Sequence, residues 1–209
     1  MSNLCIIYGS DRPNRQLDRV AAPILNLTKD IFQTVDIIDI KDLPLERCND
    51  PLSCFEIQEK PIPEKYEITY TKLQKADGFV ILSSEYIGSI PGPLKTFLDF
   101  YSCEGFRSKP IGIITYSVGM GGLSCASSLM VAIVGLEAIP LPNMVTITMY
   151  DKFVDKKGNL LPGNEFTIKN IKMLFETIKW YASALSVKRK EDGLPPSFVT
   201  FIRKFYSNS

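Results

Sequence analysis

The chain has 209 residues, 45% of them hydrophobic, with 24 basic side chains, 23 acidic side chains and no histidine. This length suits one well-packed domain, and the near-balance of charge gives no strong field for nucleic acid or an anionic membrane, so neither is expected as a partner. The lack of histidine excludes Ser-His-Asp and Cys-His nucleophiles and histidine-ligated metal sites, so no metal is expected and a cofactor would carry any difficult chemistry.

The cysteines are few and scattered. An odd number of them without a CxxC pair favours reduced thiols, and therefore a cytoplasmic protein, over a disulfide framework. The first residues lack the long apolar stretch of a signal peptide, and the longest apolar run, at 129–136, is too short to cross a bilayer. The five cysteines are Cys5, Cys48, Cys54, Cys103 and Cys125.

Apolar runs and helical patterns alternate along the chain, which indicates strands and helices in alternation. The runs that predict strands are continuously apolar, as in LCIIY at 4–8. In chain order we expect a strand at 4–8, a helix at about 16–30, strands at 35–40 and 78–83 separated by a short helix at about 66–76, a helix at about 92–103, a strand at 110–116, a helix at about 121–135, a strand at 143–147 and a long amphipathic helix at 166–188.

Three segments lack such a pattern. Residues 41–65 contain four prolines and predict a long irregular loop that could face a partner. Residues 148–165 predict a turn-rich hairpin or excursion. The end of the chain, with Pro195-Pro196 and alternating aromatic and basic residues, predicts a packed or flexible tail, and its contact with a membrane is not expected. We therefore expect one domain over residues 1–190 and a C-terminal tail over 191–209.

Continuously apolar strands that alternate with helices predict a parallel sheet covered on both faces. Five such units indicate an α/β protein with a three-layer, flavodoxin-like fold and a five-stranded parallel sheet in the order 2-1-3-4-5. Ligands bind such sheets beyond the carboxyl ends of the strands. The loops expected there, at 9–16, 84–92 and 117–122, are also the three richest in glycine, serine and proline.

The first loop, GSDRPNRQ, enters a helix whose free N–H groups offer an anion site. Ser10 can donate a hydroxyl, and Arg12 and Arg15 can make charge-assisted bonds to a phosphate. The alternative is an ordinary helix start with two solvated arginines, which Asp11 and Asp18 support by offsetting their charge. The loop is neither a GxxxxGK[ST] P-loop nor a GxGxxG fingerprint.

The second loop offers backbone groups and one ring, Tyr86, which could read and cover the edge of a flat heterocycle. The alternative is a surface loop with an exposed tyrosine. Pro93 suits the first turn of the next helix. The third loop, SVGMGG, lets the backbone approach a ligand closely, although such helix entries are common.

Three motifs together resemble the NADPH-dependent FMN reductase family, which includes quinone, azo and chromate reductases. They are GSxRxxR after the first strand, EYxxSIPGxLKxxLDF after the third and the glycine-rich loop after the fourth. The resemblance covers about residues 3–185, and its second motif is the most specific. It implies an enzyme in which FMN takes hydride from NAD(P)H and reduces a quinone, free flavin or another small acceptor in a ping-pong scheme.

The resemblance also implies where the cofactor lies and how the protein assembles. No side chain is expected to act as a catalytic acid or base, and family members are usually homodimers or homotetramers. The phosphate would lie in the first loop, and the isoalloxazine between the second and third loops. The FMN-binding residues implied are Ser10, Arg12, Arg15, Gln16, Leu17, Glu85, Tyr86, Ile87, Gly88, Ser117, Gly119, Gly121 and Gly122.

Three departures from the family pattern keep a second interpretation open. Ser84 stands where the family usually has proline, Ile87 where it usually has asparagine, and Asp11 adds a carboxylate to the phosphate loop. The alternative is a flavodoxin-like protein, with or without flavin, that acts through protein partners and has no turnover.

Two pairs of side chains outside the loops have a simpler interpretation. We expect Cys5 and Cys125 to be packed core thiols. Trp180 and Tyr181 are expected in the core or at an interface.

Overall fold

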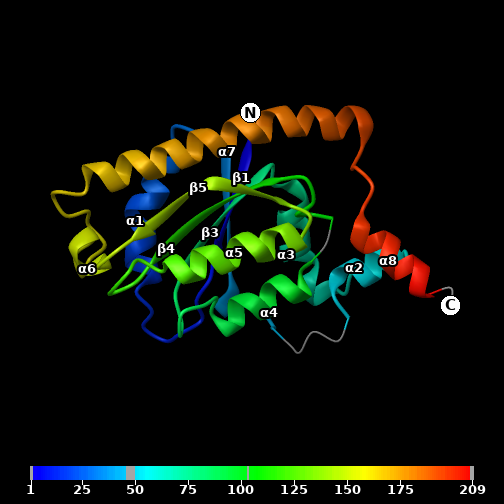
Figure 1. Ribbon diagram of the computed structural model, residues 1–209, viewed down its shortest axis with the longest axis horizontal. Coiled ribbons are helices and arrows are strands. Elements are labelled where there is room, and N and C mark those ends of the chain that lie inside the picture. The colour runs from blue at the N-terminus through cyan, green and yellow to red at the C-terminus, as the bar shows by residue number, and fades with distance from the viewer. Residues whose placement is uncertain (1, 46–49, 103, 208–209) are drawn as a thin grey trace.

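The computed structural model describes residues 2–45, 50–102 and 104–207. It contains a five-stranded parallel sheet in the order β2-β1-β3-β4-β5, which confirms the predicted topology (Figure 1). The central strands are buried on both faces because helices cover both sides, as continuous apolar runs require. The strands are β1 (Asn3–Tyr8), β2 (Thr34–Asp39), β3 (Gly78–Ser84), β4 (Pro110–Tyr116) and β5 (Ile139–Ile147).

Two hydrophobic clusters lie on opposite faces of the sheet. Helices α3 (Glu64–Lys75), α4 (Gly92–Phe100) and α5 (Leu123–Gly135) cover one face, and α1 (Leu17–Thr28) and α7 (Glu165–Asp192) cover the other. The three layers that the sequence predicts are therefore present. Cys5 and Cys125 are fully buried in the first cluster, as expected.

A pair of glycines fixes where α7 crosses the sheet. A Cβ atom on Gly78 of β3 would lie 2.8 Å from Ile178, and one on Gly112 of β4 would also lie 2.8 Å from it. These neighbouring strands thus leave a notch that the Ile178 side chain fills. Any larger residue at either position would push α7 away from the sheet.

Strand β5 begins earlier than predicted, at Ile139 instead of residue 143. The first half of β5 was not predicted as a strand because it contains Pro140 and Pro142, and proline lacks the N–H that a central strand needs. β5 pairs with β4 alone at the edge of the sheet, where prolines are tolerated, and the register shifts between Ile111 and Ile113 of β4.

The segment at 41–65, predicted to be an irregular loop, contains short helical elements, so that prediction was wrong in part. Residues 41–65 include the end of a 3-10 turn, η1 (Ile40–Asp42), and helix α2 (Leu52–Ile57). The excursion after β5 holds α6 (Tyr150–Phe153) and a bridge between Val154 and Leu160. Cys48, which belongs to the first segment, and Cys103 lie outside the described residues.

The end of the chain is also helical. Helix α7 continues to Asp192, beyond the predicted end at residue 188, and α8 (Phe198–Ser207) follows the two prolines. Trp180 of α7 lies on the surface of the isolated chain, with 67% of its area exposed, so it is not a core residue of the monomer. Among the residues described, none of the helices combines the length and apolar character needed to cross a membrane.

Candidate functional site

A cleft of about 350 Å³ opens beyond the carboxyl ends of β1, β3 and β4, where the sequence predicts a ligand site. The position follows from topology, because the chain leaves β1 and β3 in opposite directions and their loops separate. The cleft is lined by Ser10, Arg12, Pro13, Asn14, Arg15, Gln16, Ser84, Glu85, Tyr86, Tyr116, Ser117, Val118 and Tyr150.

The first loop begins with a close approach to α4. A Cβ atom on Gly9 would lie 2.7 Å from the Leu94 side chain and 2.9 Å from the Ser83 hydroxyl. The Gly9 N–H donates to the Leu82 carbonyl at 2.9 Å, so the loop leaves the sheet in a fixed direction. Ser10 follows, almost fully buried, with its Oγ 2.7 Å from the Tyr86 hydroxyl.

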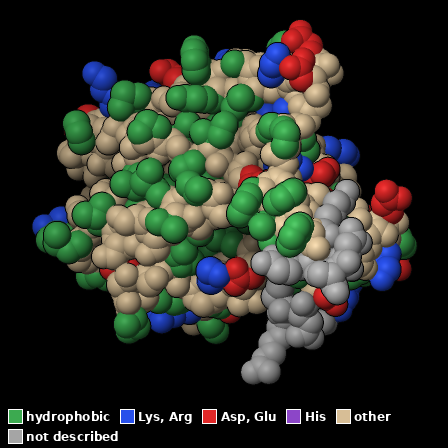
Figure 2. Space-filling model, turned by 45° about the vertical axis from the view of Figure 1, so that its right-hand side comes forward, with side chains coloured by type: hydrophobic (Ala, Val, Ile, Leu, Met, Phe, Trp, Pro, Cys, Tyr) green, Lys and Arg blue, Asp and Glu red, His purple; other side chains and the backbone are tan. Residues whose placement is uncertain are grey.

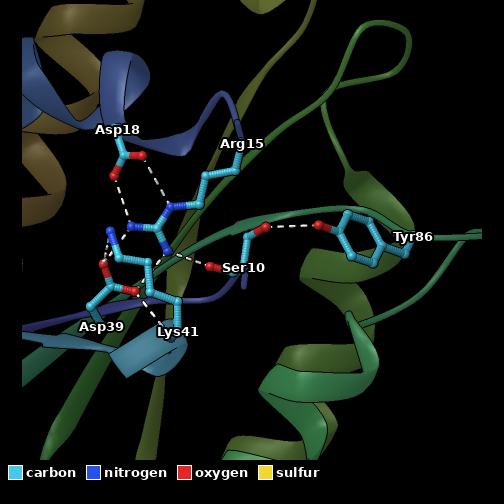
Figure 3. Close-up of polar contacts among 6 residues, drawn as sticks. All are labelled: Ser10, Arg15, Asp18, Asp39, Lys41 and Tyr86. Carbon is cyan, nitrogen blue, oxygen red and sulfur yellow. Dashed lines mark hydrogen bonds and ion pairs between the residues drawn. The ribbon is translucent and has the colours of Figure 1, made fainter. Parts of the chain in front are cut away.

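The Arg15 guanidinium uses all five of its N–H donors within the protein (Figure 3). It binds Asp39 at the end of β2 and Asp18 in the first turn of α1, with distances of 2.7 Å to each. It also donates to the main-chain carbonyl of Ser10. Only 3% of the Arg15 side chain is exposed. The buried network therefore ties the main chain of the first loop to the end of β2.

The carboxylate of Asp39 is the centre of this network. Burial opposes its ionisation, but hydrogen bonds from Arg15 and the Lys41 N–H outweigh burial and hold the pKa of Asp39 below its ordinary value. The Lys41 ammonium also lies 3.4 Å from it. Asp39 is therefore charged at neutral pH, as its contact with a buried guanidinium requires.

Arg12 has different surroundings. Its guanidinium stacks on the Tyr86 ring, 3.8 Å from the centroid, and the side chain lines the cleft. Within the described part of the chain it has no carboxylate partner. Asp11, the acidic neighbour in the loop, is exposed and does not line the cleft.

The start of α1 adds backbone donors to the same end of the cleft. No side chain caps this helix, whose N-cap residue is Gln16. The Gln16 side chain instead donates to the Asn14 carbonyl at 3.2 Å. An uncapped helix N-terminus beside a free guanidinium is suited to a phosphate group.

The second loop is a tight turn. Tyr86 and Ser89 exchange both backbone hydrogen bonds at 3.1 Å, and the residues between them, Ile87 and Gly88, have φ angles of +48° and +66°. Two positive φ values define a type I′ turn, which favours Asn-Gly and disfavours a β-branched residue. Ile87 is fully exposed, and neither it nor Gly88 lines the cleft.

Glu85 connects this turn to the third loop. Its carboxylate accepts a hydrogen bond of 3.1 Å from the N–H of Cys125, in the first turn of α5. A carboxylate at a helix N-terminus is stabilised by the helix dipole. Glu85 therefore fixes the start of α5 relative to β3, in addition to lining the cleft.

The third loop is held by hydroxyl groups. Thr115 donates to the Gly121 carbonyl and the Gly121 N–H donates to Ser117 Oγ, both at 2.8 Å. Gly121 and Gly122 have φ angles of +74° and +82°, which favour glycine. Like Gly119, they shape the loop without lining the cleft.

The structure thus brings seven of the thirteen predicted residues together. Leu17, for which a contact through the backbone is expected, has its side chain fully buried in the core, and that backbone contact stays a prediction. The residues that line the cleft as predicted are Ser10, Arg12, Arg15, Gln16, Glu85, Tyr86 and Ser117.

Sequence reasoning missed two tyrosines. Tyr116 ends β4 and Tyr150 begins α6, and their rings meet edge to face at 5.7 Å between centroids. Burial raises the pKa of Tyr116 well above its ordinary value, so its hydroxyl stays protonated at neutral pH. The position of Tyr116 at a strand end was a usable signal, whereas Tyr150 lay in a segment with no periodic pattern.

The chemistry of the cleft is that of a binding site for a flat anion. It offers one unpaired guanidinium, backbone N–H groups, hydroxyls and aromatic rings. Among the residues described there is no group of three or more carboxylate or thiol side chains that could hold a metal ion.

Comparison with known proteins agrees with this geometry. A family model described as NADPH-dependent FMN reductase matches residues 2–152. The chain is 30% identical over 166 residues to an NAD(P)H-dependent FMN reductase of Schizosaccharomyces pombe, an alignment that covers 78% of this chain and 81% of that protein. It is 29% identical over 136 residues to an FMN-dependent NADPH-azoreductase of Staphylococcus saprophyticus, with 65% and 71% covered.

Solved structures show the same fold. The flavoenzyme NAD(P)H:(acceptor) oxidoreductase FerB of Paracoccus denitrificans superposes with a TM-score of 0.68 at 18% identity, and the match covers 88% of this chain and 98% of FerB. An NADH:FMN oxidoreductase superposes with a TM-score of 0.64 at 13% identity, covering 96% of this chain and 94% of the other.

Proposed function

We propose a specific role for the cleft from the premise that this chain belongs to the NADPH-dependent FMN reductase family and is an FMN-dependent NAD(P)H oxidoreductase. In this proposal the cleft beyond β1, β3 and β4 holds FMN. The observation that carries it is the pairing of an uncapped helix α1 with the free guanidinium of Arg12 at one end of the cleft.

The phosphate of FMN would bind at that end. Arg12 supplies the cation, the first N–H groups of α1 supply directional donors, and Ser10 adds a hydroxyl. Arg15 has a supporting role here, because its donors are all used to hold the Ser10 carbonyl and the end of β2. The sequence suggested that Arg12 and Arg15 both contact the phosphate, whereas in this proposal only Arg12 does.

The flat ring of FMN would lie between the second and third loops. Tyr86 and Tyr116 offer aromatic surface beside it, and the loop around Ser117 would lie along its other side. The redox chemistry is supplied by FMN when it is bound, since it takes up hydride from NAD(P)H and returns the electrons to an acceptor. The side chains of this chain bind and orient it, and Tyr116 keeps its proton.

We include quinones, free flavin and similar small acceptors in this proposal. An open cleft with one binding face suits a ping-pong scheme, in which oxidised NAD(P)+ leaves before the acceptor enters. No protein acid or base is required, which agrees with a chain that has no histidine.

A homo-oligomer is also part of the proposal, with two or four copies. Residues 123–135 of α5 include no charged side chain, yet Leu123, Val131 and Val134 are exposed on the isolated chain. Depletion of charge with exposed aliphatic residues is typical of the centre of a homodimer interface. A cytoplasmic location is supported by the free thiols of Cys5 and Cys125.

The first test is the visible spectrum of the purified protein before and after addition of FMN. Flavin bands that survive desalting and are bleached by NADPH without oxygen support the proposal. A protein that takes up no FMN would refute it.

The assignment of Arg12 has its own test. Arg12→Ala should weaken FMN binding by roughly tenfold to a hundredfold and leave riboflavin, which lacks the phosphate, little affected. Lys95→Ala is the matched control, because Lys95 is an exposed cation on α4 that pairs with Asp99 away from the cleft. Equal losses for FMN and riboflavin would contradict the assignment.

A further inference from the structure

Helix α8 turns an aromatic face away from the protein. Phe198, Phe201 and Phe205 are exposed by 71%, 62% and 63% of their area, and their spacing of three and four residues places them on one side of the helix. Figure 2, which turns this side of the molecule forward, shows hydrophobic side chains gathered on it. Large apolar groups in such an arrangement mark an interaction surface.

Polar contacts on the inner side fix the rotation of α8. The Glu137 carboxylate accepts a hydrogen bond of 3.0 Å from the Val199 N–H and pairs with Arg107 at 2.9 Å. Arg107 also donates to the Pro195 carbonyl at 2.5 Å. Val199 and Thr200 line a cavity of about 280 Å³ between α8, α2 and the end of α5. The first turn of α8 is therefore anchored by its polar side, which leaves the phenylalanines outward.

The charged residues of α8 itself are of one sign, whereas carboxylates such as Glu137 lie on its inner side. The helix carries Arg203 and Lys204 and no acidic residue. At the end of α7, Lys188 pairs with Asp192 and Arg189 with Asp77, so the basic charge of α8 comes from its own two residues. Residues 188–209 contain five basic side chains against two acidic ones, although the whole chain is nearly neutral. No membrane contact was expected from the near-zero net charge of the whole chain. That overall value does not reveal the local excess of basic residues near the C-terminus.

We propose that α8 binds the surface of a lipid bilayer that contains anionic lipids. A short helix with phenylalanines on one face and only basic charges lies in the plane of the interface, with its rings at the boundary of headgroups and acyl chains. Basic side chains near such a surface are each attracted by an amount that strengthens binding by about fivefold. Pairing α8 with the α8 of a second copy would instead bring like charges together.

The proposal is tested by flotation of the full-length protein, loaded with FMN, with vesicles of phosphatidylcholine alone or mixed with phosphatidylserine. We expect binding to the mixed vesicles, weakened by salt, and little binding to phosphatidylcholine alone. Replacing the three phenylalanines by serine should lower partitioning by on the order of a hundredfold. Phe166→Ser is the control, because Phe166, at the start of α7, is an even more exposed phenylalanine outside α8.

A second variant separates charge from apolar contact. Arg203→Gln with Lys204→Gln should weaken binding to anionic vesicles by about 25-fold and remove most of the salt dependence. Absence of flotation with either vesicle, or flotation unchanged by the triple substitution, would overturn the proposal. So would a fall in oligomer mass for the triple variant in sedimentation, which would assign α8 to a second copy. Flavin spectra of all variants confirm that the fold and the cleft are intact.

Discussion

Replacing Asp39 by asparagine tests whether the Arg15 network supports the cleft or competes for its ligand. The substitution keeps the shape of the side chain and removes its charge. Arg15 is 3% exposed and Asp39 14%, and loss of one partner of a buried pair costs about 3–5 kcal/mol. Asp18 remains as a second partner, but it is 57% exposed, so we expect a loss of about 2 kcal/mol in the free energy of unfolding.

That loss should lower the melting temperature by about 4–8 °C for a chain of this size. The matched control is Asp42→Asn, an exposed carboxylate in the same 3-10 turn, for which little change is expected. The pKa of Asp39 is lowered in the folded protein, so its contribution is present at neutral pH and lost as the pH falls through that lowered pKa. Acid titration of the variant should show a smaller loss of stability.

The sign of the effect on FMN affinity decides between two roles for Arg15. If Arg15 holds the Ser10 carbonyl in place, Asp39→Asn and Arg15→Lys should each weaken FMN binding by about tenfold, and the double variant should be little worse than either. If Arg15 binds the phosphate, removal of Asp39 would release its guanidinium and leave FMN binding unchanged or tighter. FMN titrations of the variants measure this directly, and unchanged or tighter binding to Asp39→Asn would refute the supporting role.

Three further predictions concern the loops and the core. Ile87→Asn should raise the melting temperature by about 2–4 °C, because asparagine tolerates the positive φ that strains isoleucine; a lower value would contradict the turn geometry. Gly122→Ala should destabilise by about 2 kcal/mol in a denaturant titration, whereas Gly119→Ala, with open space around it, should be nearly neutral; equal effects would count against the described loop. Burial raises the pKa of Cys125 to about 11 and of Cys5 to about 12, so peptide mapping after alkylation at pH 8 should find both thiols unmodified until the protein is denatured; rapid labelling of either would show that the core opens.

Structural features that depend on local sequence could be predicted. Continuous apolar runs predicted the strands and their order, and glycine- and proline-rich loops at strand ends predicted the cleft. Elements that depend on tertiary context were missed: β5 begins with two prolines that only an edge position tolerates, and α8 follows two prolines with no long periodic pattern. The division into a domain at 1–190 and a tail stays a prediction.

The site was predicted in outline for the same reason. Arg15 was correctly placed at the cleft, but its partner Asp39 lies 24 residues further along the chain at the end of another strand. Only the adjacency of β1 and β2 brings the two together, and no local pattern encodes that contact. The resemblance to a family supplied the ligand, whereas the structure shows that Arg15 is bound by two carboxylates and that Arg12 stacks on Tyr86.

The length of α7 determines where the cleft lies relative to α8. Its 28 residues extend about 42 Å, from the cleft side of the sheet at α6 to beyond the opposite edge, where Arg107 and Glu137 receive the start of α8 (Figure 1). The cleft and α8 therefore lie at opposite ends of the strands. A protein resting on a bilayer through α8 would point its cleft toward the aqueous phase, and its electron acceptors would arrive from solution and not from within the lipid.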